Sequence, residues 1–312
     1  MRALVTGGAG FIGSHLATTL VERGDEVVVL DSLATGHRSN VPDGARFVEG
    51  SVADPDTVAD AVAGCEVVFH LGALGAVARS VADPLTSDTA NVRGTLAVLT
   101  GARDAGVRRL VFASSSSIYG GADIIPTPES APLRPRSPYA VTKLTGEHYC
   151  RVFAELFELE TVALRYFNVF GPRQRPDSVY AAVIPLFARA LLDGNSPTVH
   201  GDGRQSRDFT FVSDVVAANL AASIADASKC NGRAFNIAGG HQHSLLDLLS
   251  ELGLIIGIDA TPTFGPSRAG DVLHSCADPS SARVALGFEC SVTFATGLAQ
   301  TVDWMRSQLP PT

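Results

Sequence analysis

A glycine-rich turn stands directly after the first strand-like run of this chain. The residues TGGAGFIG, 6–13, follow the run RALVT and open the helical pattern SHLATTLVERG. Gly7 permits a tight turn, Gly10 lets a pyrophosphate approach the backbone, and Gly13 lets the helix and the strand pack closely. Backbone N–H groups and the helix dipole attract an anion at such a helix N-terminus. The segment therefore predicts a strand, a phosphate-binding turn and a helix, in preference to a purely structural glycine turn.

The turn opens a regular alternation of strands and helices. Strand-like runs occupy residues 2–6, 26–31, 46–50, 66–73, 108–116 and 161–171, with helical patterns between them. Such alternation is typical of a parallel sheet covered by helices on both faces. After about residue 172 prolines and glycines interrupt the pattern, and a helix at 209–226 and a strand at 234–240 return to the sheet.

We therefore expect an α/β fold, a doubly wound parallel Rossmann sheet with a smaller C-terminal substrate-binding domain. The first domain is predicted to take residues 1–170 and 208–240. The second is predicted to take residues 171–207 and 241–312.

Composition and charge exclude several classes of protein. The 312 residues are 46% hydrophobic and 18% charged, and the formal charge is -8 with a pI near 5.4. This acidic balance argues against a nucleic-acid surface, for which a basic stripe is expected. The sequence after Met1 lacks a signal-peptide pattern and no apolar run is long enough for a bilayer, so we expect a cytoplasmic protein. The five cysteines are scattered without a C-x-x-C pair, and neither a disulfide framework nor a metal site is expected.

An acidic residue closes the second strand-like run. Asp31 ends EVVVLD, where a carboxylate can hold both hydroxyls of a cofactor ribose. Together with the glycine turn, this residue predicts a dinucleotide-binding site. A carboxylate at this place repels a 2'-phosphate, so NAD is favoured over NADP.

A tyrosine and a lysine stand four residues apart in SPYAVTK, residues 137–143. A proline-broken loop ends just before them and a helix can begin, so Tyr139 and Lys143 share one helix face, roughly 5–6 Å apart at Cβ. This spacing also occurs in ordinary amphipathic helices. Free tyrosine has a pKa of about 10, but a lysine ammonium together with the positive nicotinamide favours the phenolate. Beside a dinucleotide site, the pair predicts a general base.

Motifs spread over nearly the whole chain resemble those of a known family. The glycine spacing, ASSSSIYG at 113–120 and Tyr139-x-x-x-Lys143 together resemble the extended short-chain dehydrogenase/reductase superfamily. Within it, the chain is most similar to the nucleotide-sugar 4-epimerases. That similarity rests on HLGA at 70–73, NVRGT at 91–95, RYFNVFGPRQ at 165–174, RDFTFVSDV at 207–215 and RAGD at 268–271. Each motif alone is unspecific, but their order and spacing together are specific.

The resemblance assigns roles to individual residues. It implies a catalytic set of Ser115, Tyr139 and Lys143. It implies NAD contacts from Gly7, Gly10, Phe11, Ile12, Gly13, Asp31, Ser51, Val52 and Leu71, besides Tyr139 and Lys143. It implies that a UDP-sugar is bound by Ser116, Ser117, Asn168, Arg175, Arg207, Arg268 and Asp271. Ser51 departs from the family pattern, because many relatives have an aspartate there that contacts adenine.

The implied reaction is epimerisation at C4' of the UDP-sugar. Tyr139 would take the proton from a sugar hydroxyl while its carbon gives hydride to NAD, and Ser115 would orient that oxygen. Relatives that dehydrate or decarboxylate the sugar have Asp or Glu where this chain has Ser116 and Ser117. The 4-keto sugar is therefore expected to rotate and take the hydride back on its opposite face. A net NAD-dependent oxidoreductase and a non-enzymatic NAD-binding protein are the alternatives from other classes.

The substrate-binding segments carry conflicting signals about the sugar. FGPRQRPD at 170–177 resembles the uronate epimerases, in which an arginine, here Arg175, meets the sugar carboxylate. VYAAVIPLF at 179–187 resembles epimerases of N-acetylated sugars, and the small Ser275 leaves room for an acetamido group. We expect UDP-glucuronate and/or UDP-glucose, with UDP-N-acetylglucosamine as the alternative.

Two further expectations follow from the resemblance. Arg207 and Arg268 match arginines that grip the diphosphate, although either could instead pair with a neighbouring aspartate. Epimerases of this kind commonly pair through two long helices, here at about 86–105 and 138–157, so a homodimer is expected.

Overall fold

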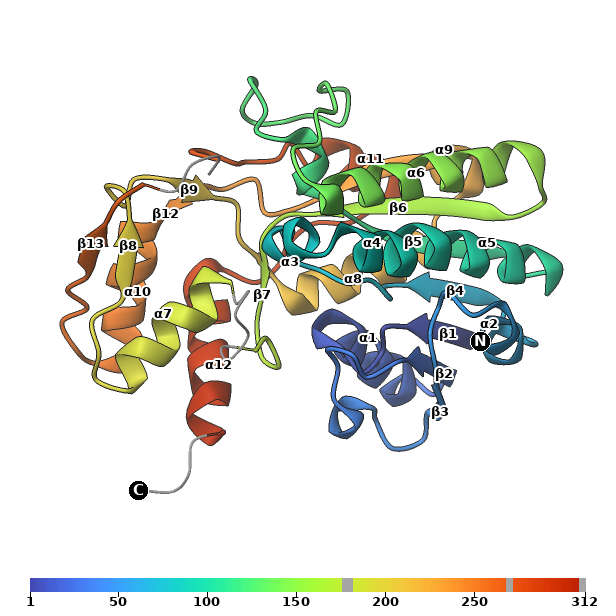
Figure 1. The fold of residues 1–312 in the computed structure, drawn as a ribbon, viewed down its shortest axis with the longest axis horizontal. Helices are drawn as coiled ribbons and strands as arrows, with labels where there is room; N and C mark the ends of the chain where they lie inside the picture. The colour runs from blue at the N-terminus through green and yellow to red at the C-terminus, as the bar shows by residue number, and fades with distance from the viewer. Residues whose placement is uncertain (176–181, 268–271, 309–312) are drawn as a thin grey trace.

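A parallel sheet forms the centre of the larger part of the molecule (Figure 1). The computed structural model describes residues 1–175, 182–267 and 272–308. Within them, the sheet has seven strands in the order β11-β6-β5-β4-β1-β2-β3, and every neighbouring pair is parallel. The strands are β1 (Arg2–Thr6), β2 (Glu26–Asp31), β3 (Arg46–Glu49), β4 (Val67–His70), β5 (Arg109–Ser115), β6 (Glu160–Tyr166) and β11 (Arg233–Ile237). The expected doubly wound Rossmann architecture is confirmed.

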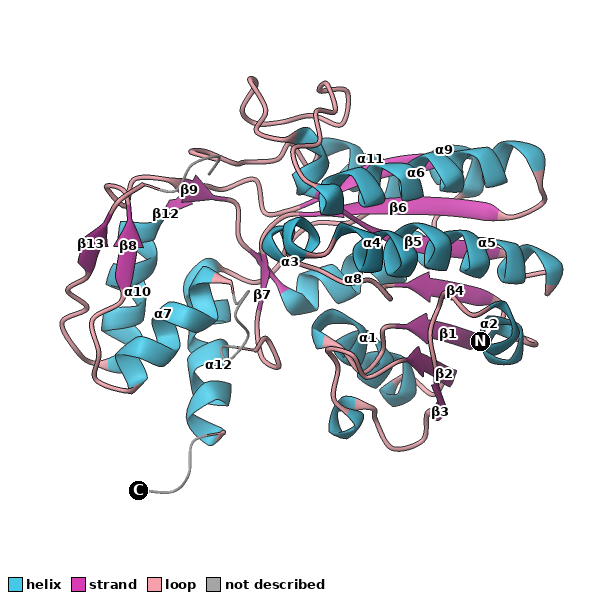
Figure 2. Ribbon diagram, viewed as in Figure 1, coloured by secondary structure: helices cyan, strands magenta, loops and turns pink. Residues whose placement is uncertain are grey.

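Helices cover both faces of this sheet (Figure 2). One apolar core lies under α1 (Phe11–Glu22), α8 (Val212–Ile224) and α11 (Ser280–Leu286), and a second lies under α2 (Pro55–Val62), α5 (Gly94–Asp104) and α6 (Pro138–Leu156). Successive strand residues alternate between the two cores, as Val5 and Leu4 do. Strands buried on both faces explain the continuous apolar runs in the sequence. Helix α11 belongs to this layer although it lies within residues 241–312.

A smaller lobe is built from segments that follow the sixth strand. It contains α7 (Val183–Leu192), α10 (Leu245–Ile256), α12 (Phe294–Ser307) and the parallel pair β8 (Thr198–His200) and β13 (Thr263–Gly265). Their buried side chains, such as Phe187, Leu248 and Leu298, form a core of their own. Two short strand pairs complete the described part, β7 (Val169–Phe170) with β10 (Thr210–Phe211) and β9 (Ser206–Arg207) with β12 (His243–Ser244).

Two expected element boundaries were wrong. The run at 161–171 is not one strand, because Asn168 adopts a positive φ of 33° and turns the chain between β6 and β7. The region at 86–105 is interrupted as well, since α4 (Pro84–Asp88) is followed by a wider helical turn at Thr89–Arg93 before α5 begins. The shorter helices α3 (Val77–Ala82) and α9 (Ala227–Cys230) flank the sheet. None of the described helices is both long enough and apolar enough to cross a membrane.

Candidate active site

The glycine turn after β1 requires glycine for steric reasons. Gly7 has a φ of +70°, and a Cβ atom there would stand 2.8 Å from the amide nitrogen of Gly72. A methyl group at Gly13 would overlap the carbonyl oxygen of Gly7. The amide of Gly10 donates to that same carbonyl at 3.1 Å. The turn thus presents bare backbone at the N-terminus of α1, which suits an approaching phosphate.

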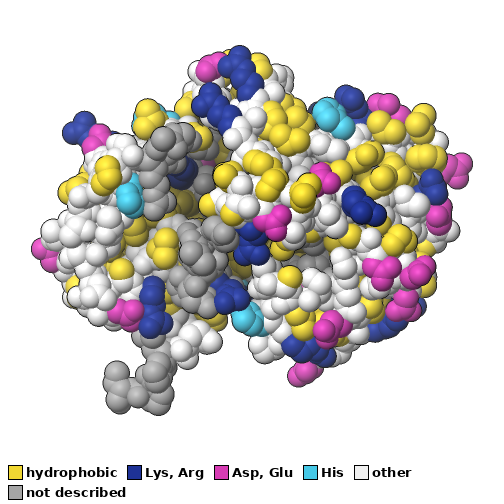
Figure 3. Space-filling model, viewed as in Figure 1, with side chains coloured by type: hydrophobic (Ala, Val, Ile, Leu, Met, Phe, Trp, Pro, Cys, Tyr) yellow, Lys and Arg dark blue, Asp and Glu magenta, His cyan; other side chains and the backbone are white. Residues whose placement is uncertain are grey.

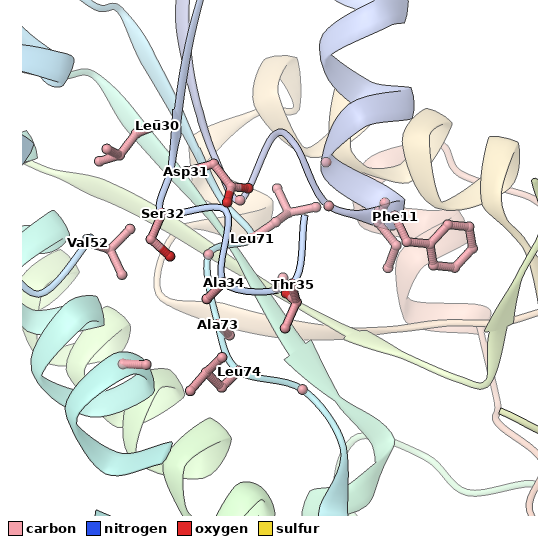
Figure 4. Close-up of a pocket in the computed structure, with 18 of the residues that line it drawn as sticks. Phe11, Leu30, Asp31, Ser32, Ala34, Thr35, Val52, Leu71, Ala73 and Leu74 are labelled. Atoms are coloured by element: carbon pink, nitrogen blue, oxygen red, sulfur yellow. The ribbon is translucent and has the colours of Figure 1, made fainter. Parts of the chain in front are cut away.

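Asp31 is held rigidly at the end of β2. Its carboxylate accepts hydrogen bonds from the amides of Ala9, at 3.0 Å, and Leu33, at 2.8 Å. The side chain is 8% exposed. Figure 4 shows it above Ser32 and Leu71, at the wall of a pocket. A carboxylate fixed in this way can accept hydrogen bonds from a ribose without losing side-chain entropy.

This pocket, which we call the cofactor pocket, has a volume of about 310 Å³. Every residue that the sequence assigned to NAD lines it: Gly7, Gly10, Phe11, Ile12, Gly13, Asp31, Ser51, Val52, Leu71, Tyr139 and Lys143. Sequence reasoning missed Ser32, Ala34, Thr35, Ala73 and Leu74, which also line it (Figure 4). They follow β2 and β4 at the carboxyl edge of the sheet, where ligands of doubly wound folds bind. Their position directly after these strands could have identified them in the sequence as pocket residues.

Helix α6 begins just where the sequence pattern indicated. The Ser137 hydroxyl caps it by accepting a 3.2 Å hydrogen bond from the amide of Ala140, and Pro138 occupies the first turn. The amide of Tyr139 donates to the hydroxyl of Ser80 at 3.0 Å. These contacts satisfy N–H groups that a helix start leaves unpaired, so the position of Tyr139 is well determined.

Burial governs the ionisation of the tyrosine–lysine pair in the protein without NAD. Burial raises the pKa of Tyr139 above its usual 10.0, and a hydrogen bond from Ser115 only partly opposes this. Burial also lowers the pKa of Lys143 to about 8. The Lys143 Nζ atom lies 5.9 Å from the centre of the Tyr139 ring. In the protein without NAD, burial therefore dominates the pKa of Tyr139. The effect of Lys143 together with the cationic nicotinamide stays a prediction for the NAD-bound protein.

A second cavity, the sugar pocket, adjoins the first and has a volume of about 570 Å³. Ser115, Ser116, Ser117, Asn168 and Arg207 line it, as the sequence indicated. Tyr139, Ser114, Ile12 and Tyr166 line both pockets. The Tyr139 side chain is thus shared by the two cavities.

The structure does not bring every predicted substrate residue to the sugar pocket. Arg268 and Asp271 lie outside the described residues. Arg175 is exposed and stands apart from the described lining of both pockets. Ser275 does line the sugar pocket, and so does Arg136, which sequence reasoning missed. The signal for Arg136 was its position three residues before Tyr139.

The comparison with known proteins identifies the family. Residues 3–238 match the NAD dependent epimerase/dehydratase family. This chain is a member of that family. Because the family is NAD-dependent, its cofactor is NAD.

Solved structures similar to this epimerase/dehydratase family member carry several sugar specificities. The UDP-glucose 4-epimerase of Thermotoga maritima, solved with UDP-glucose, has 37% identity and a TM-score of 0.95, covering 99% of this chain and 100% of that one. The UDP-N-acetylglucosamine 4-epimerase of Methanobrevibacter ruminantium has 36% identity and a TM-score of 0.94, covering 99% of each. MoeE5 in complex with UDP-glucuronic acid and NAD has 38% identity and a TM-score of 0.87, covering 99% and 100%.

The residues of this family member fit the cofactor that the family name implies. Gly7 and Gly13 let the turn and the helix pack closely, and with Gly10 they bring bare backbone to the wall of the cofactor pocket, which suits a pyrophosphate. Asp31 offers a fixed acceptor pair for ribose hydroxyls, and it would repel a 2'-phosphate. The Lys143 ammonium lies at the pocket wall with its orientation set by a 2.7 Å hydrogen bond to the carbonyl of Ala113.

A third cavity of about 330 Å³ continues from the sugar pocket into the smaller lobe. It shares Asn168 and Arg207 with the sugar pocket, and it is lined further by Phe187, His200, Gln205 and Phe209. Aromatic rings beside a few polar groups suit a flat heterocycle. Sequence reasoning assigned no role to Phe187, His200, Gln205 or Phe209, because they come from segments whose convergence depends on the tertiary fold.

Proposed function

We propose that this protein is an NAD-dependent C4' epimerase of UDP-sugars that acts on UDP-glucuronate, UDP-glucose or both. The observation that carries the proposal is the place of Tyr139, which lines both the cofactor pocket and the sugar pocket. A proton acceptor at that junction can serve a hydroxyl whose carbon faces the nicotinamide. The family membership supports the same activity.

The catalytic roles follow from this arrangement. Tyr139 removes the proton from the 4'-hydroxyl and later returns it, while Ser115 orients that oxygen. NAD, when bound, supplies reversible hydride transfer. Lys143 binds the nicotinamide ribose, and its ammonium together with the cationic nicotinamide opposes the burial that otherwise raises the pKa of Tyr139.

The lining of the sugar pocket supports return of the hydride over elimination. Ser116 and Ser117 line the pocket, at positions where the sequence resemblance implies Asp or Glu in dehydrating relatives. Without a carboxylic acid or carboxylate at those positions, loss of a leaving group from the sugar lacks its proton donor and acceptor. The 4-keto sugar therefore persists until it has rotated in the pocket and can take the hydride back on its opposite face.

The rest of the substrate can extend from the sugar pocket into the third cavity. Arg207 and Asn168 line both, so they are placed to contact the diphosphate. The nucleoside then occupies the cavity beside Phe187 and Phe209. Arg268 and Asp271 remain part of the proposal, although they lie outside the described residues.

Two sugars other than glucose have specific support. The similarity to MoeE5, which was solved with UDP-glucuronic acid, supports a uronate substrate. The sequence resemblance keeps Arg175 as our proposed partner of the sugar carboxylate, although Arg175 lies outside the described lining of the sugar pocket. The similarity to the epimerase of M. ruminantium favours UDP-N-acetylglucosamine, and the small side chain of Ser275 in the sugar pocket agrees with an acetamido group. UDP-glucuronate and UDP-glucose are our first choice, because neither sugar requires the pocket to accommodate an acetamido group.

The proposed function is tested by product configuration. The purified protein is incubated with UDP-glucose, UDP-glucuronate and UDP-N-acetylglucosamine, each with NAD, and the C4' configuration is followed by NMR. Epimerisation without net reduction of NAD is the expected result. Accumulation of NADH in proportion to the sugar consumed would show a net oxidoreductase and remove the proposal.

We also propose that the protein is a cytoplasmic homodimer. Apolar side chains are exposed along α3, α4 and α6, including Val81 (63% exposed), Leu85 (80%) and Leu156 (70%). Figure 3 shows yellow side chains gathered over this face of the molecule. Exposed apolar side chains on neighbouring helices favour an interface, and we place it between copies of α4 to α6. All five cysteines are free, which is typical of a reducing compartment.

A further inference from the structure

The described lining of the sugar pocket carries more positive than negative charge. Arg136 and Arg207 line it. Among its described lining residues there is no aspartate or glutamate. The described lining, with two guanidinium groups and no carboxylate, attracts anionic ligands.

The two arginines serve different parts of the cavity. Arg207 also lines the third cavity and donates to the backbone carbonyls of Ser206, at 2.9 Å, and Leu273, at 3.3 Å. Arg136 lines the sugar pocket without lining the third cavity. It stands next to Ser137, which caps α6, and three residues before Tyr139. Arg136 therefore belongs to the catalytic end of the pocket, away from the proposed nucleoside.

The described residues provide no counter-charge for Arg136. Its neighbour Arg134 forms an ion pair with Asp123 at 2.8 Å. Within residues 1–175, 182–267 and 272–308, Arg136 forms no ion pair and no hydrogen bond through its guanidinium. An arginine at a pocket rim without an internal partner keeps its donors for a ligand.

The backbone holds Arg136 against the pocket wall. The amide of Arg134 donates to the carbonyl of Ile118 at 2.9 Å, which joins this segment to the serine-rich turn after β5. Gly120 ends that turn with a φ of +66°, and a Cβ atom there would stand 3.1 Å from Cγ of Arg136. The alkyl stem of Arg136 thus packs on Gly120, and both residues line the sugar pocket.

We propose that Arg136 is a specificity residue that binds the carboxylate of a uronic-acid substrate. The inference rests on the proposed epimerase function and adds a second cation to Arg175. A neutral hexose offers this guanidinium only hydroxyl groups, at an exposed position where such contacts contribute little. A carboxylate offers a bidentate, charge-assisted pair, so the selectivity arises from the difference between the two sugars.

The test compares two neighbouring arginines in the full-length protein. R136Q removes the proposed contact, and R134Q removes an exposed arginine of the same segment that is paired with Asp123 and does not line the pocket. For each variant, kcat/KM is measured on UDP-glucuronate and on UDP-glucose, and the ratio of the two values is compared with wild type. We expect R136Q to lower the ratio about tenfold, corresponding to about 1.4 kcal/mol, and R134Q to change it less than about twofold.

A conservative variant separates charge from packing. R136K keeps a cation and an alkyl stem, so its ratio of kcat/KM on UDP-glucuronate to that on UDP-glucose should lie between those of R136Q and the wild type. Added salt should lower the ratio of R136K toward that of R136Q. A ratio for R136Q within about twofold of wild type would overturn the inference. So would a wild-type enzyme that epimerises UDP-glucose but not UDP-glucuronate. Failure of the wild type on every UDP-sugar would instead remove the proposed function, so the two failures are distinguishable.

Discussion

The ammonium of Lys143 donates a 2.7 Å hydrogen bond to the carbonyl oxygen of Ala113. This bond joins α6 to β5 two residues before Ser115, so it connects the three proposed catalytic residues through one contact. The Lys143 side chain is 5% exposed, and the energetic cost of burying its charge is visible in its lowered pKa. The hydrogen bond therefore fixes the position of the Lys143 ammonium, although burial of its charge is unfavourable.

Replacement of the proposed base should remove the chemistry and keep the fold. Tyr139→Phe is expected to lower the rate of C4' epimerisation by roughly 10²–10⁴-fold, because the phenol oxygen is the proton acceptor. The backbone hydrogen bond to Ser80 and the ring are retained. Tyr149→Phe, on the same helix but outside the cofactor and sugar pockets, is the control. NMR of the product measures the epimerisation rate of each variant, and circular dichroism checks that the fold is retained. Similar losses of rate in both variants would contradict the assignment of Tyr139 as the base.

The lowered pKa of Lys143 predicts a specific dependence of stability on pH. Between its folded pKa of about 8 and its ordinary value of 10.5, the unfolded chain binds more protons than the folded chain. The contribution of Lys143 to the free energy of unfolding therefore rises with pH in that window. Relative to Lys143→Met, the wild type should gain about 2 kcal/mol between about pH 7 and pH 9.5. Urea unfolding of the cofactor-free proteins measures this, and a difference independent of pH would show that Lys143 titrates normally.

A buried ion pair under the serine-rich turn should contribute strongly to stability. Glu147 accepts hydrogen bonds from Arg165 Nε, at 2.9 Å, and Nη2, at 2.7 Å, and also from the hydroxyl of Ser114. Both partners are almost fully buried. Glu147→Gln should lower the free energy of unfolding by about 3 kcal/mol, because Arg165 keeps a buried charge without its counterion.

The same helix offers a matched control for that pair. Glu155 lies 3.8 Å from Arg151 and both side chains are exposed. Glu155→Gln should therefore change the free energy of unfolding by less than about 1 kcal/mol. Denaturant titration measures the free energy of unfolding of both variants. Equal decreases would show that the buried pair contributes no more to stability than the exposed pair.

The glycine turn should not tolerate a methyl group. Gly13→Ala would place Cβ against the carbonyl oxygen of Gly7 and distort the turn, so NAD affinity should fall at least about tenfold, or about 1.4 kcal/mol. Gly24→Ala lies at a φ of +87° in open space, and it should cost about 1 kcal/mol of stability without changing NAD affinity. Calorimetric titration with NAD measures the affinity of each variant and distinguishes Gly13→Ala from Gly24→Ala. Unchanged affinity in Gly13→Ala would exclude the turn as the phosphate site.

Charge placed on the exposed apolar face should dissociate the proposed dimer. Leu85→Glu and Leu156→Glu introduce carboxylates on α4 and at the end of α6. Sedimentation should then detect monomers at concentrations where the wild type is dimeric. Ile224→Glu is the control, since Ile224 is 74% exposed but ends α8, which covers the opposite face of the sheet. A monomeric wild type would remove the prediction.

The predictions from sequence succeeded where local geometry determines position. Gly7 and Gly13 lie where strand, turn and helix must place them, and Tyr139 and Lys143 share a face because a helix repeats every 3.6 residues. Each of these relationships spans a few residues, so steric rules and hydrogen bonding along the chain are sufficient to predict it.

The tertiary structure determined the rest of the site. The inclusion of Arg136 in the described lining of the sugar pocket depends on how the segment at 134–136 packs on the turn at Gly120. The raised pKa of Tyr139 is a consequence of burial under other segments. Such properties arise from contacts between residues that are distant in the chain. Desolvation and charge pairing depend on which atoms surround a group in space, and that is decided only when the sheet and its helices have packed.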